Sequence, residues 1–303
     1  MVSLLIGVVL AAGASTLYSL GIAVQALDAR DASDHHALRL SLLVHLVTRA
    51  RWLFGTGMTV IGWPLQLLAL SLAGLVVVQP TLALGLLVLL AVGERMLGET
   101  PGRREMLAVA AIAAGVAGIA ALAPAQDTRH AHGLAIVVVL AVLGAAALLP
   151  FVLQFLGRPI AGVTIVGAGL AFGWSGLVNQ FVADAGANGR WGPAIGWAAA
   201  AAFAAVVGLT AEMSALQRRP AILVAPVVFV VQTVAPILVA PLVLHSSFVQ
   251  TPLSGIPLLG CLLVLLAGAI TISRSPALLA LTGPARSDQL NSAESGSPSS
   301  PSE

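Results

Sequence analysis

The sequence predicts an all-α membrane protein of about nine transmembrane helices, and three observations support this fold class. Apolar residues make up 58% of the 303 residues and charged residues only 9%, whereas a soluble protein of this length needs a far more charged surface. The mean hydropathy is +1.01. The apolar residues also lie in long unbroken runs, which exclude the alternating pattern of a membrane β-barrel.

The apolar runs are each long enough to cross a hydrocarbon core of about 30 Å as a helix. They cover residues 3–26, 52–70, 74–92, 105–123, 133–154, 160–182, 193–212, 220–244 and 253–273. No Lys or Arg precedes the first run, so it is expected to be a retained helix rather than a cleaved signal peptide. We expect residues 1–123 and 124–273 to form two transmembrane repeats, and residues 274–303 to form a disordered cytoplasmic tail.

Arginine placement predicts the orientation. Twelve of the 14 basic residues, all of them arginine, fall in the tail and in the loops 28–51, 94–104, 156–159 and 213–219. By the positive-inside rule these loops and the C-terminus are cytoplasmic, and an odd number of spans puts the N-terminus outside. The charges are dispersed rather than gathered in a patch, which argues against nucleic-acid binding. The expected partner is the lipid bilayer of the cell membrane.

One segment, residues 34–49, leaves the number of spans open. Its apolar stretch is too short to cross a membrane comfortably, and Ser41, His45 and Thr48 fall on one face of a helix. The pattern favours an amphipathic helix that lies at the cytoplasmic interface within the loop 28–51. If the segment did span, the protein would have ten transmembrane helices and a cytoplasmic N-terminus.

Two stretches of the sequence match at an offset of 146 residues. Six of the 21 residues from 60 to 80 are identical to those 146 positions later, including the pairs Gly62 with Gly208 and Pro80 with Pro226. The predicted topology gives the matched spans opposite directions. Two repeats of inverted topology are typical of secondary transporters, in which one half rocks against the other.

Short motifs in both halves carry a family resemblance. The first half contains Leu68-Ala69-Leu70, Gln79-Pro80, Val92-Gly93-Glu94-Arg95 and a glycine-rich helix with Gly115 and Gly118. The second half contains Ala215-Leu216-Gln217-Arg218-Arg219-Pro220 and Ala225-Pro226. These motifs resemble the drug/metabolite transporter superfamily, which includes the EamA-type proteins. The reduced first half and the short cytoplasmic segment after the first helix look most like the NIPA-type magnesium transporters within it.

The resemblance covers about residues 4–273 and rests on motifs built from common residues. It implies a ten-helix plan in which this chain lacks the second helix as a full span. It also implies a central cavity lined by 52–70, 74–92, 193–212 and 220–244. A magnesium pathway would offer several oxygen ligands, yet the apolar runs hold almost no carboxylate. A small metabolite and a divalent cation therefore both stay open as substrates.

Glu212 is the main candidate for a substrate-binding residue, because it is an ionisable group that ends an apolar run. Its carboxylate can hold a cation, a proton or the counter-charge of a substrate. Alternatively, it lies at the interfacial end of its helix or pairs with Arg218 or Arg219.

The other binding candidates are uncharged. The amides of Gln66, Gln79, Asn179 and Gln232 can bind a substrate in a cavity or join two helices. Trp63 can stack on a cationic substrate, and core packing is the alternative. Together with Glu212, these residues form the predicted binding set.

Prolines and glycines suggest bends and close contacts. Pro80 and Pro226 are expected to kink their helices, and the carbonyls they free can take part in gating or coordination. Gly169 and Gly173 form a close-packing motif that fits either an internal contact or a homodimer, and the internal contact is favoured.

Enzymatic and metal chemistry find little support in the sequence. His35-His36 and His130 with His132 come without further ligands at site spacing, so no metal site and no cofactor are expected. Phosphate-binding loops and hydrolase motifs are absent, which argues against an enzyme and against ATP-driven transport by this chain alone. The expected function is secondary transport by alternating access. A non-transporting membrane scaffold and a translocator of lipid carriers are the alternatives.

Overall fold

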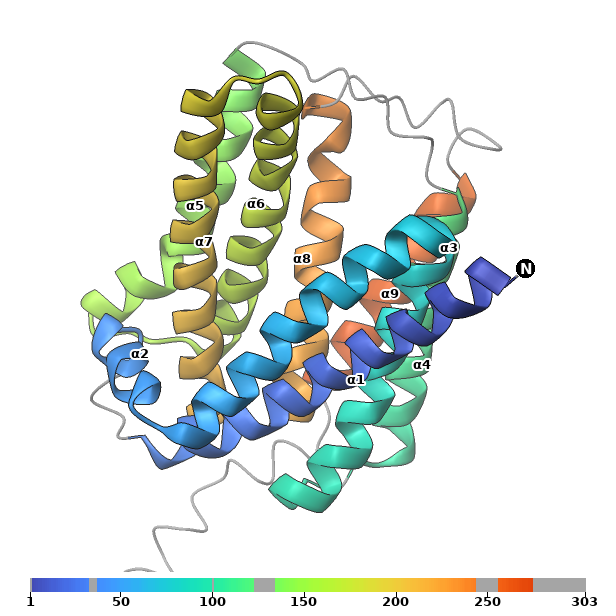
Figure 1. The fold of residues 1–303 in the computed structure, drawn as a ribbon. Coiled ribbons are helices and arrows are strands. Elements are labelled where there is room, and N and C mark those ends of the chain that lie inside the picture. Colours follow the sequence, from blue (N-terminus) through green and yellow to red (C-terminus); the bar gives the residue numbers. More distant parts are fainter. Residues whose placement is uncertain (1, 33–36, 100, 123–133, 244–255, 275–303) are drawn as a thin grey trace, which may run out of the picture.

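The computed structural model describes residues 2–32, 37–99, 101–122, 134–243 and 256–274, and all regular structure within these ranges is α-helical (Figure 1). The helices are α1 Val2–Asp31, α2 Leu40–Val47, α3 Ala50–Leu97, α4 Arg103–Leu122, α5 Leu134–Phe155, α6 Ala161–Ala187, α7 Trp191–Arg218, α8 Ala221–Val243 and α9 Ile256–Ser273. The predicted all-α fold class is confirmed, and most predicted spans agree with a helix to within a few residues.

The longest helix, α3, folds back on itself and packs along α1 twice. In its first arm Gln66 contacts Tyr18 and Thr56 contacts Gln25, so later residues of α1 contact earlier residues of α3. In its second arm the carbonyls of Leu82 and Gly85 accept hydrogen bonds from Ser15 and Ser19, so later residues of α1 contact later residues of α3. The first arm is therefore antiparallel to α1 and the second arm parallel to it.

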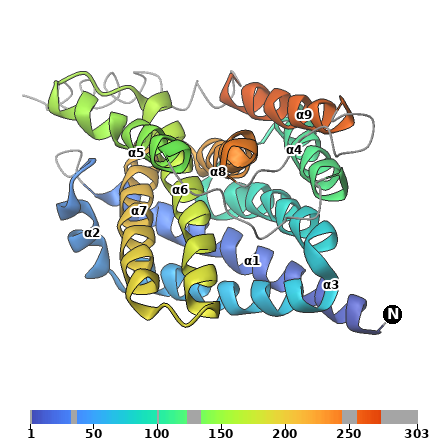
Figure 2. The same ribbon diagram turned by 90° about the horizontal axis from the view of Figure 1, so that it is seen from above.

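The reversal takes place between Ala69 and Leu82. Ala69 and Val78 both pack on Ala11, although nine residues of straight helix would hold them about 13 Å apart. Figures 1 and 2 show the two arms of α3 meeting at an angle near its label. Pro80 falls within this stretch, where the sequence predicted a kink.

The sequence predicted two separate spans, 52–70 and 74–92, where the structure has one continuous helical assignment of 48 residues. The two spans correspond to the two arms. A bilayer core offers no water to backbone groups, so a chain that turns inside or near it keeps its backbone hydrogen-bonded as helix. Ala-, Leu- and Val-rich sequence allows this, and no loop residues separate the arms.

The remaining helices pack around α8, which contacts every other long helix and lies between the α5–α7 group and the α4–α9 pair (Figure 2). Gly169 and Gly173 form the contact of α6 with α8. A Cβ at Gly169 would lie 2.6 Å from Cβ of Val231, and one at Gly173 would lie 3.3 Å from the carbonyl oxygen of Gln232. The predicted internal packing role of these glycines is confirmed.

One end of the molecule collects most of the described arginines, and we call it the basic end. Helices α1, α3 and α7 finish there, since Gln217 of α7 donates to the carbonyl of Ala32 after α1, and Arg30 of α1 donates to the carbonyl of Leu97 in α3. Helices α4, α6 and α8 start there, and so does the first arm of α3, whose Arg51 pairs with Asp28 near the end of α1. The arginines at this end include Arg30, Arg49, Arg51, Arg95, Arg103, Arg104, Arg158, Arg218 and Arg219.

The short helix α2 lies within segment 34–49, for which the sequence left two possibilities open, and it covers residues 40–47. Its eight residues extend about 12 Å, far less than a bilayer core. Leu42 and Leu46 are fully buried against the bundle, whereas Leu40 and Val44 are exposed. An apolar exposed side beside a buried one suits a helix at a lipid interface, as the sequence predicted.

The outer surface of the bundle is apolar, as a lipid-facing surface must be. Large hydrophobic side chains are exposed on every long helix, among them Val9, Ile61, Leu107, Val142, Phe203 and Leu263. Four helices are long and apolar enough to cross a membrane, and these are α1, α5, α6 and α7 within the described residues. The apolar parts of α8 and α9 are shorter there, 221–236 and 256–272. Together these features are consistent with a helical membrane protein.

Candidate functional site

Glu212 lies inside α7 rather than at its end. The helix continues for six residues beyond it, to Arg218, because Met213 to Gln217 keep the helical pattern and pack against other elements. Every residue from Thr210 to Leu216 is buried, so α7 is enclosed on all sides at this level. The sequence alternative of an interfacial helix end for Glu212 is therefore wrong.

Helix geometry places Glu212 on the side of α7 that lies between α6 and the start of α3. One turn earlier, Gly208 contacts the ring of Phe172 on α6, and one residue later, Sδ of Met213 accepts a hydrogen bond from Trp52 of α3 at 3.3 Å. At about 100° per residue, Glu212 points between these two directions. Only 7% of its surface is exposed, and within the described ranges no hydrogen bond or ion pair reaches it.

Gln66 is engaged elsewhere. Its Oε1 accepts a hydrogen bond of 2.7 Å from the hydroxyl of Tyr18, which joins α1 to the first arm of α3. Trp52, at the level of Glu212, precedes Gln66 by 14 residues, which is about 21 Å of helix. The structure therefore does not bring Gln66 and Glu212 together in one site.

The other predicted binding residues are dispersed. Trp63 is 63% exposed on the outer surface of α3, and Asn179 is exposed near the end of α6. Gln232 is half-buried on α8, where its backbone contacts Gly173. Pro226 is buried in α8. The side chains of Gln79 and Pro80 lie outside what the structure describes.

Sequence reading missed a row of polar side chains on α1. Ser15, Ser19 and Gln25 are buried and bond to α3, and Ser19 bonds to the carbonyl of Gly85 at 2.6 Å. Hydroxyls and one amide among many alanines carry little signal in a sequence. The spacing of Ser15 and Ser19, about one turn, could have identified a face that joins two helices.

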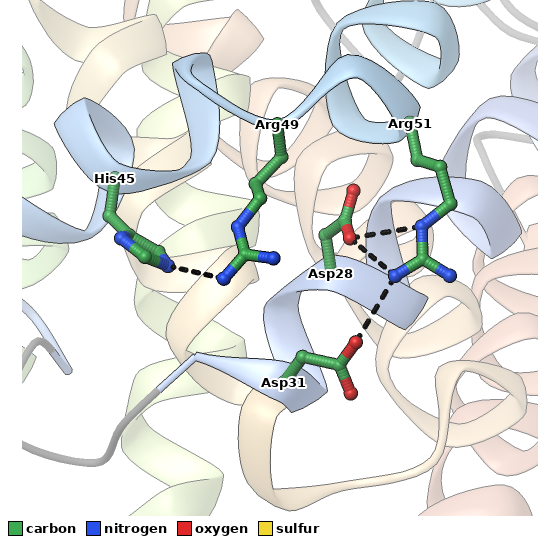
Figure 3. A network of polar contacts seen from close by, with 5 residues as sticks. All are labelled: Asp28, Asp31, His45, Arg49 and Arg51. Carbon is green, nitrogen blue, oxygen red and sulfur yellow. Dashed lines mark hydrogen bonds and ion pairs between the residues drawn. The ribbon is translucent and has the colours of Figure 1, made fainter.

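A charged network holds α1 to the start of α3 (Figure 3). Arg51 donates to Oδ1 of Asp28 at 2.8 Å and to Oδ2 of Asp31 at 3.1 Å. The hydrogen bond and charge of Asp28 raise the pKa of Arg51 above its ordinary value. Beside this network, Arg49 contacts the ring of His45 in α2 at 3.3 Å. Asp28 is almost fully buried, and its Oδ2 has no partner in the described part of the chain.

Glu99, which the sequence did not single out, is the most strongly bonded carboxylate of the basic end. Its oxygens accept the backbone N–H groups of Ala221 at 2.7 Å and Ile222 at 2.9 Å, and they pair with Arg30. Only 2% of its surface is exposed. Three parts of the chain, the end of α1, the loop after α3 and the start of α8, therefore meet at one side chain.

Two cavities lie near the basic end beside α6. A small cavity of about 20 Å³, enough for a water molecule, is lined by Gln154, Thr164, Ser214 and Arg218 together with apolar residues such as Leu38 and Ala161. A larger one of about 230 Å³ is lined by Ala161, Gly162, Ile165, Val166, Arg219, Leu223 and Val227. None of the predicted binding residues lines either cavity.

Metal ligands do not gather in the described ranges, where no three His, Cys, Asp or Glu side chains come together. The pairs His35-His36 and His130 with His132 lie outside the described residues. No protein-family model, curated protein or solved structure matches this chain.

Proposed function

We propose that this chain is a secondary transporter of the drug/metabolite transporter superfamily. It moves a small metabolite or a cation across the cell membrane by alternating access between two inverted repeats, with its C-terminus in the cytoplasm. The observation that carries the proposal is that the same helix contacts occur twice in the molecule, in opposite directions. Transporters that alternate between two access states are commonly built from such repeats.

The first repeated contact is a glycine against an aromatic ring. A Cβ at Gly62 would lie 2.7 Å from the ring of Tyr18, and one at Gly208 would lie 3.0 Å from the ring of Phe172. The glycines are the pair matched in sequence at an offset of 146. The rings are 154 residues apart, so α1 corresponds to α6 and the first arm of α3 to α7.

The same two offsets relate further contacts. Ser15 of α1 donates to the carbonyl of Leu82 and leaves no room for a Cβ on Gly85, whereas Gly169 of α6 lies against the carbonyl of Val228 and the side chain of Val231. Six residues further along these helices, Gly21 lies against the carbonyl of Gly55, and Ser175 donates to the carbonyl of Ala201 at 3.0 Å. The second arm of α3 thus corresponds to α8.

Helices α4 and α9 correspond to each other across their own interface. Gly268 lies against Ala108 and Ile112, and Gly115 lies against Cys261 and Leu265. Exchanging the two helices with an offset of 153 residues converts the first set of contacts into the second. A local two-fold axis across antiparallel helices is the relation that inverted repeats require.

The basic end supports the inversion. Helix α1 finishes at this end, whereas its counterpart α6 starts there. The first arm of α3 starts there, whereas α7 finishes there. The second arm of α3 finishes there, whereas α8 starts there. Each member of a pair therefore runs opposite to its counterpart. The concentration of arginine at this end favours its assignment to the cytoplasm.

This correspondence changes the repeat boundaries that the sequence suggested. The first repeat comprises α1, the two arms of α3 and α4, and the second comprises α6 to α9. Helix α5 has no counterpart, and α2 is an insertion between α1 and α3. On a ten-helix plan the missing helix is then the first rather than the second.

Glu212 is the residue we assign to the transport pathway. It lies in the middle of the bundle on α7, and no counter-charge reaches it in the described residues. An ionised carboxylate in such a place costs several kcal/mol unless a proton or cation accompanies it. A site that needs an external positive charge suits a cationic substrate or a coupling ion.

Flux measurements in proteoliposomes test the proposal. We would follow uptake of Mg²⁺, of a quaternary amine and of neutral amino acids into vesicles that contain the purified chain. Saturable flux of one of them is expected, with a loss of about tenfold or more in Glu212→Gln. Glu94→Gln, which removes an exposed carboxylate, is the control and should transport normally.

Two results would contradict parts of this proposal. Normal flux in Glu212→Gln would remove Glu212 from the pathway. Absence of any protein-dependent flux would favour the non-transporting scaffold.

The translocation of a lipid carrier is a second candidate, favoured by the cavity of about 230 Å³ between α6 and α8. Its lining is apolar except for Arg219, which suits an acyl or isoprenoid chain with an anionic head. A fluorescent polyprenyl phosphate that exchanges between leaflets only in vesicles containing the protein would support it.

A further inference from the structure

The Glu99 contact joins the two proposed repeats. Arg30 and Glu99 belong to the first repeat, at the end of α1 and in the loop after α3, whereas Ala221 and Ile222 open α8 in the second. Gly93 makes room for it, since a Cβ there would lie 2.8 Å from Cγ2 of Ile222 and 3.4 Å from Oε2 of Glu99.

The hydrogen bonds to Glu99 are of a kind that can hold the start of α8 in one fixed position. The first N–H groups of a helix have no acceptor inside the helix, and a carboxylate that takes them also meets the positive end of the helix dipole. Arg30 balances the charge of Glu99 and reaches the carbonyl of Leu97 at 3.4 Å. Moving α8 away from α1 and α3 at this end breaks both N–H bonds to Glu99 at once, whereas the pair of Glu99 with Arg30 stays within the first repeat.

We propose that Glu99 and Arg30 form the closed gate at the basic end of the transport pathway, with the N-terminus of α8 as the part that separates from them. This inference rests on the proposed transport function. One turn into α8, Ala225 packs against Ala23 of α1 and Leu89 of α3, so the seam between the repeats is sealed directly behind the gate. Opening toward the cytoplasm requires the Glu99 bonds to break and this seam to part.

The neighbouring pair Asp28 and Arg51 provides a matched control. It is also an ion pair of a buried aspartate at the basic end, with an N–O distance of 2.8 Å. Both partners belong to the first repeat, because Asp28 is on α1 and Arg51 is on the first arm of α3. Breaking this pair does not release α8.

Cysteine labelling tests the gate without requiring a substrate. In a Cys261→Ser background, Ala225→Cys places a thiol in the seam, and a membrane-impermeant maleimide reports its accessibility in lipid nanodiscs. We expect Glu99→Gln to raise the labelling rate by about tenfold or more, because the gate then opens more often. Asp28→Asn should leave the rate unchanged.

A second reporter separates gating from unfolding. Ala201→Cys lies in a buried cluster with Leu140 of α5 and Val178 of α6, away from the basic end. It should stay unreactive in the Glu99→Gln variant. An unchanged rate at Ala225→Cys, or equal reactivity at both reporters, would overturn the gate. Because labelling needs no flux, an absence of transport by the unmodified protein would instead count against the proposed function.

Discussion

The ring of Tyr18 lies against Gly62 so closely that a Cβ on the glycine would be 2.7 Å from Cε1 of the tyrosine. The same relation joins Phe172 to Gly208 at 3.0 Å. Aromatic rings packed on glycine let two helix backbones approach, and this contact occurs once between α1 and α3 and once between α6 and α7.

Alanine at either glycine should therefore destabilise the protein to a similar extent. We expect Gly62→Ala and Gly208→Ala each to lower the free energy of unfolding by about 1–3 kcal/mol, since the ring must move. Thermal unfolding of the detergent-solubilised protein measures this. Gly57→Ala and Gly196→Ala are controls on the same two helices, because a Cβ at either meets nothing within 4 Å.

The hydrogen bond between Tyr18 and Gln66 should show a measurable coupling. Tyr18→Phe and Gln66→Leu each remove one partner of a 2.7 Å bond between α1 and α3. A double-mutant cycle on thermal stability should give a coupling energy of about 1 kcal/mol. A coupling near zero, with flux lost only in Gln66→Leu, would return Gln66 to a substrate-binding role.

We expect the Glu212 carboxylate to lower the free energy of unfolding of the protein and yet to be needed for transport. Glu212→Gln removes a charge that has no partner among the described residues, so the free energy of unfolding should rise by about 1–3 kcal/mol. Transport should fall in the same variant, because functional sites often retain groups that a stable core would not. A variant that is both less stable and inactive would instead show that Glu212 has a structural role.

Removing the charge of Arg51 should lower the stability of the protein more than removing the charge of Asp28. Arg51→Met leaves the carboxylate of Asp28 buried without its charge partner, whereas Asp28→Asn leaves an exposed arginine that water can solvate. The melting temperature should therefore fall further in Arg51→Met. The reverse order would mean that the bond of Arg51 to Asp31 matters more than its bond to Asp28.

The proposed orientation predicts labelling from opposite sides of the membrane. In a Cys261→Ser background, Arg95→Cys places a thiol at the basic end and Asn188→Cys places one in the short connection between α6 and α7. In intact cells an impermeant maleimide should label only Asn188→Cys. Labelling of Arg95→Cys alone would invert the topology.

Sequence patterns sufficed for the helices and failed for the charged contacts, for a physical reason. Long apolar runs must become helices in lipid, so their bounds could be read directly. Glu94 and Glu99 both fall in the loop that the sequence predicts over residues 94–104, and nothing in the sequence distinguishes a carboxylate that caps a distant helix from an exposed one. The position of Glu212 depended on how far α7 continues past the apolar run, which tertiary contacts decide.

The proposed repeat left a signal in the sequence only over residues 60–80, where Gly62 and Pro80 are among the residues that recur 146 positions later. Gly62 and Gly208 match because both must admit a ring, whereas Ser15 and Gly169 occupy equivalent places with different residues. Two helix backbones can approach closely at either a serine or a glycine, so the residue types differ although the helix contact is the same. The fold-back of α3 was likewise hidden, because a turn that stays helical leaves no loop signal.

If the two proposed repeats are inverted copies of one unit, helix α5 explains how that unit can be present in both orientations. A unit of four crossings returns the chain to the side of the membrane on which it began. Joined end to end, two such units would enter the bilayer in the same direction and would have parallel architecture. The single extra crossing of α5 delivers the chain to the opposite face before the second unit starts. In the proposed topology the helix without a counterpart therefore sets the inverted orientation of the second repeat.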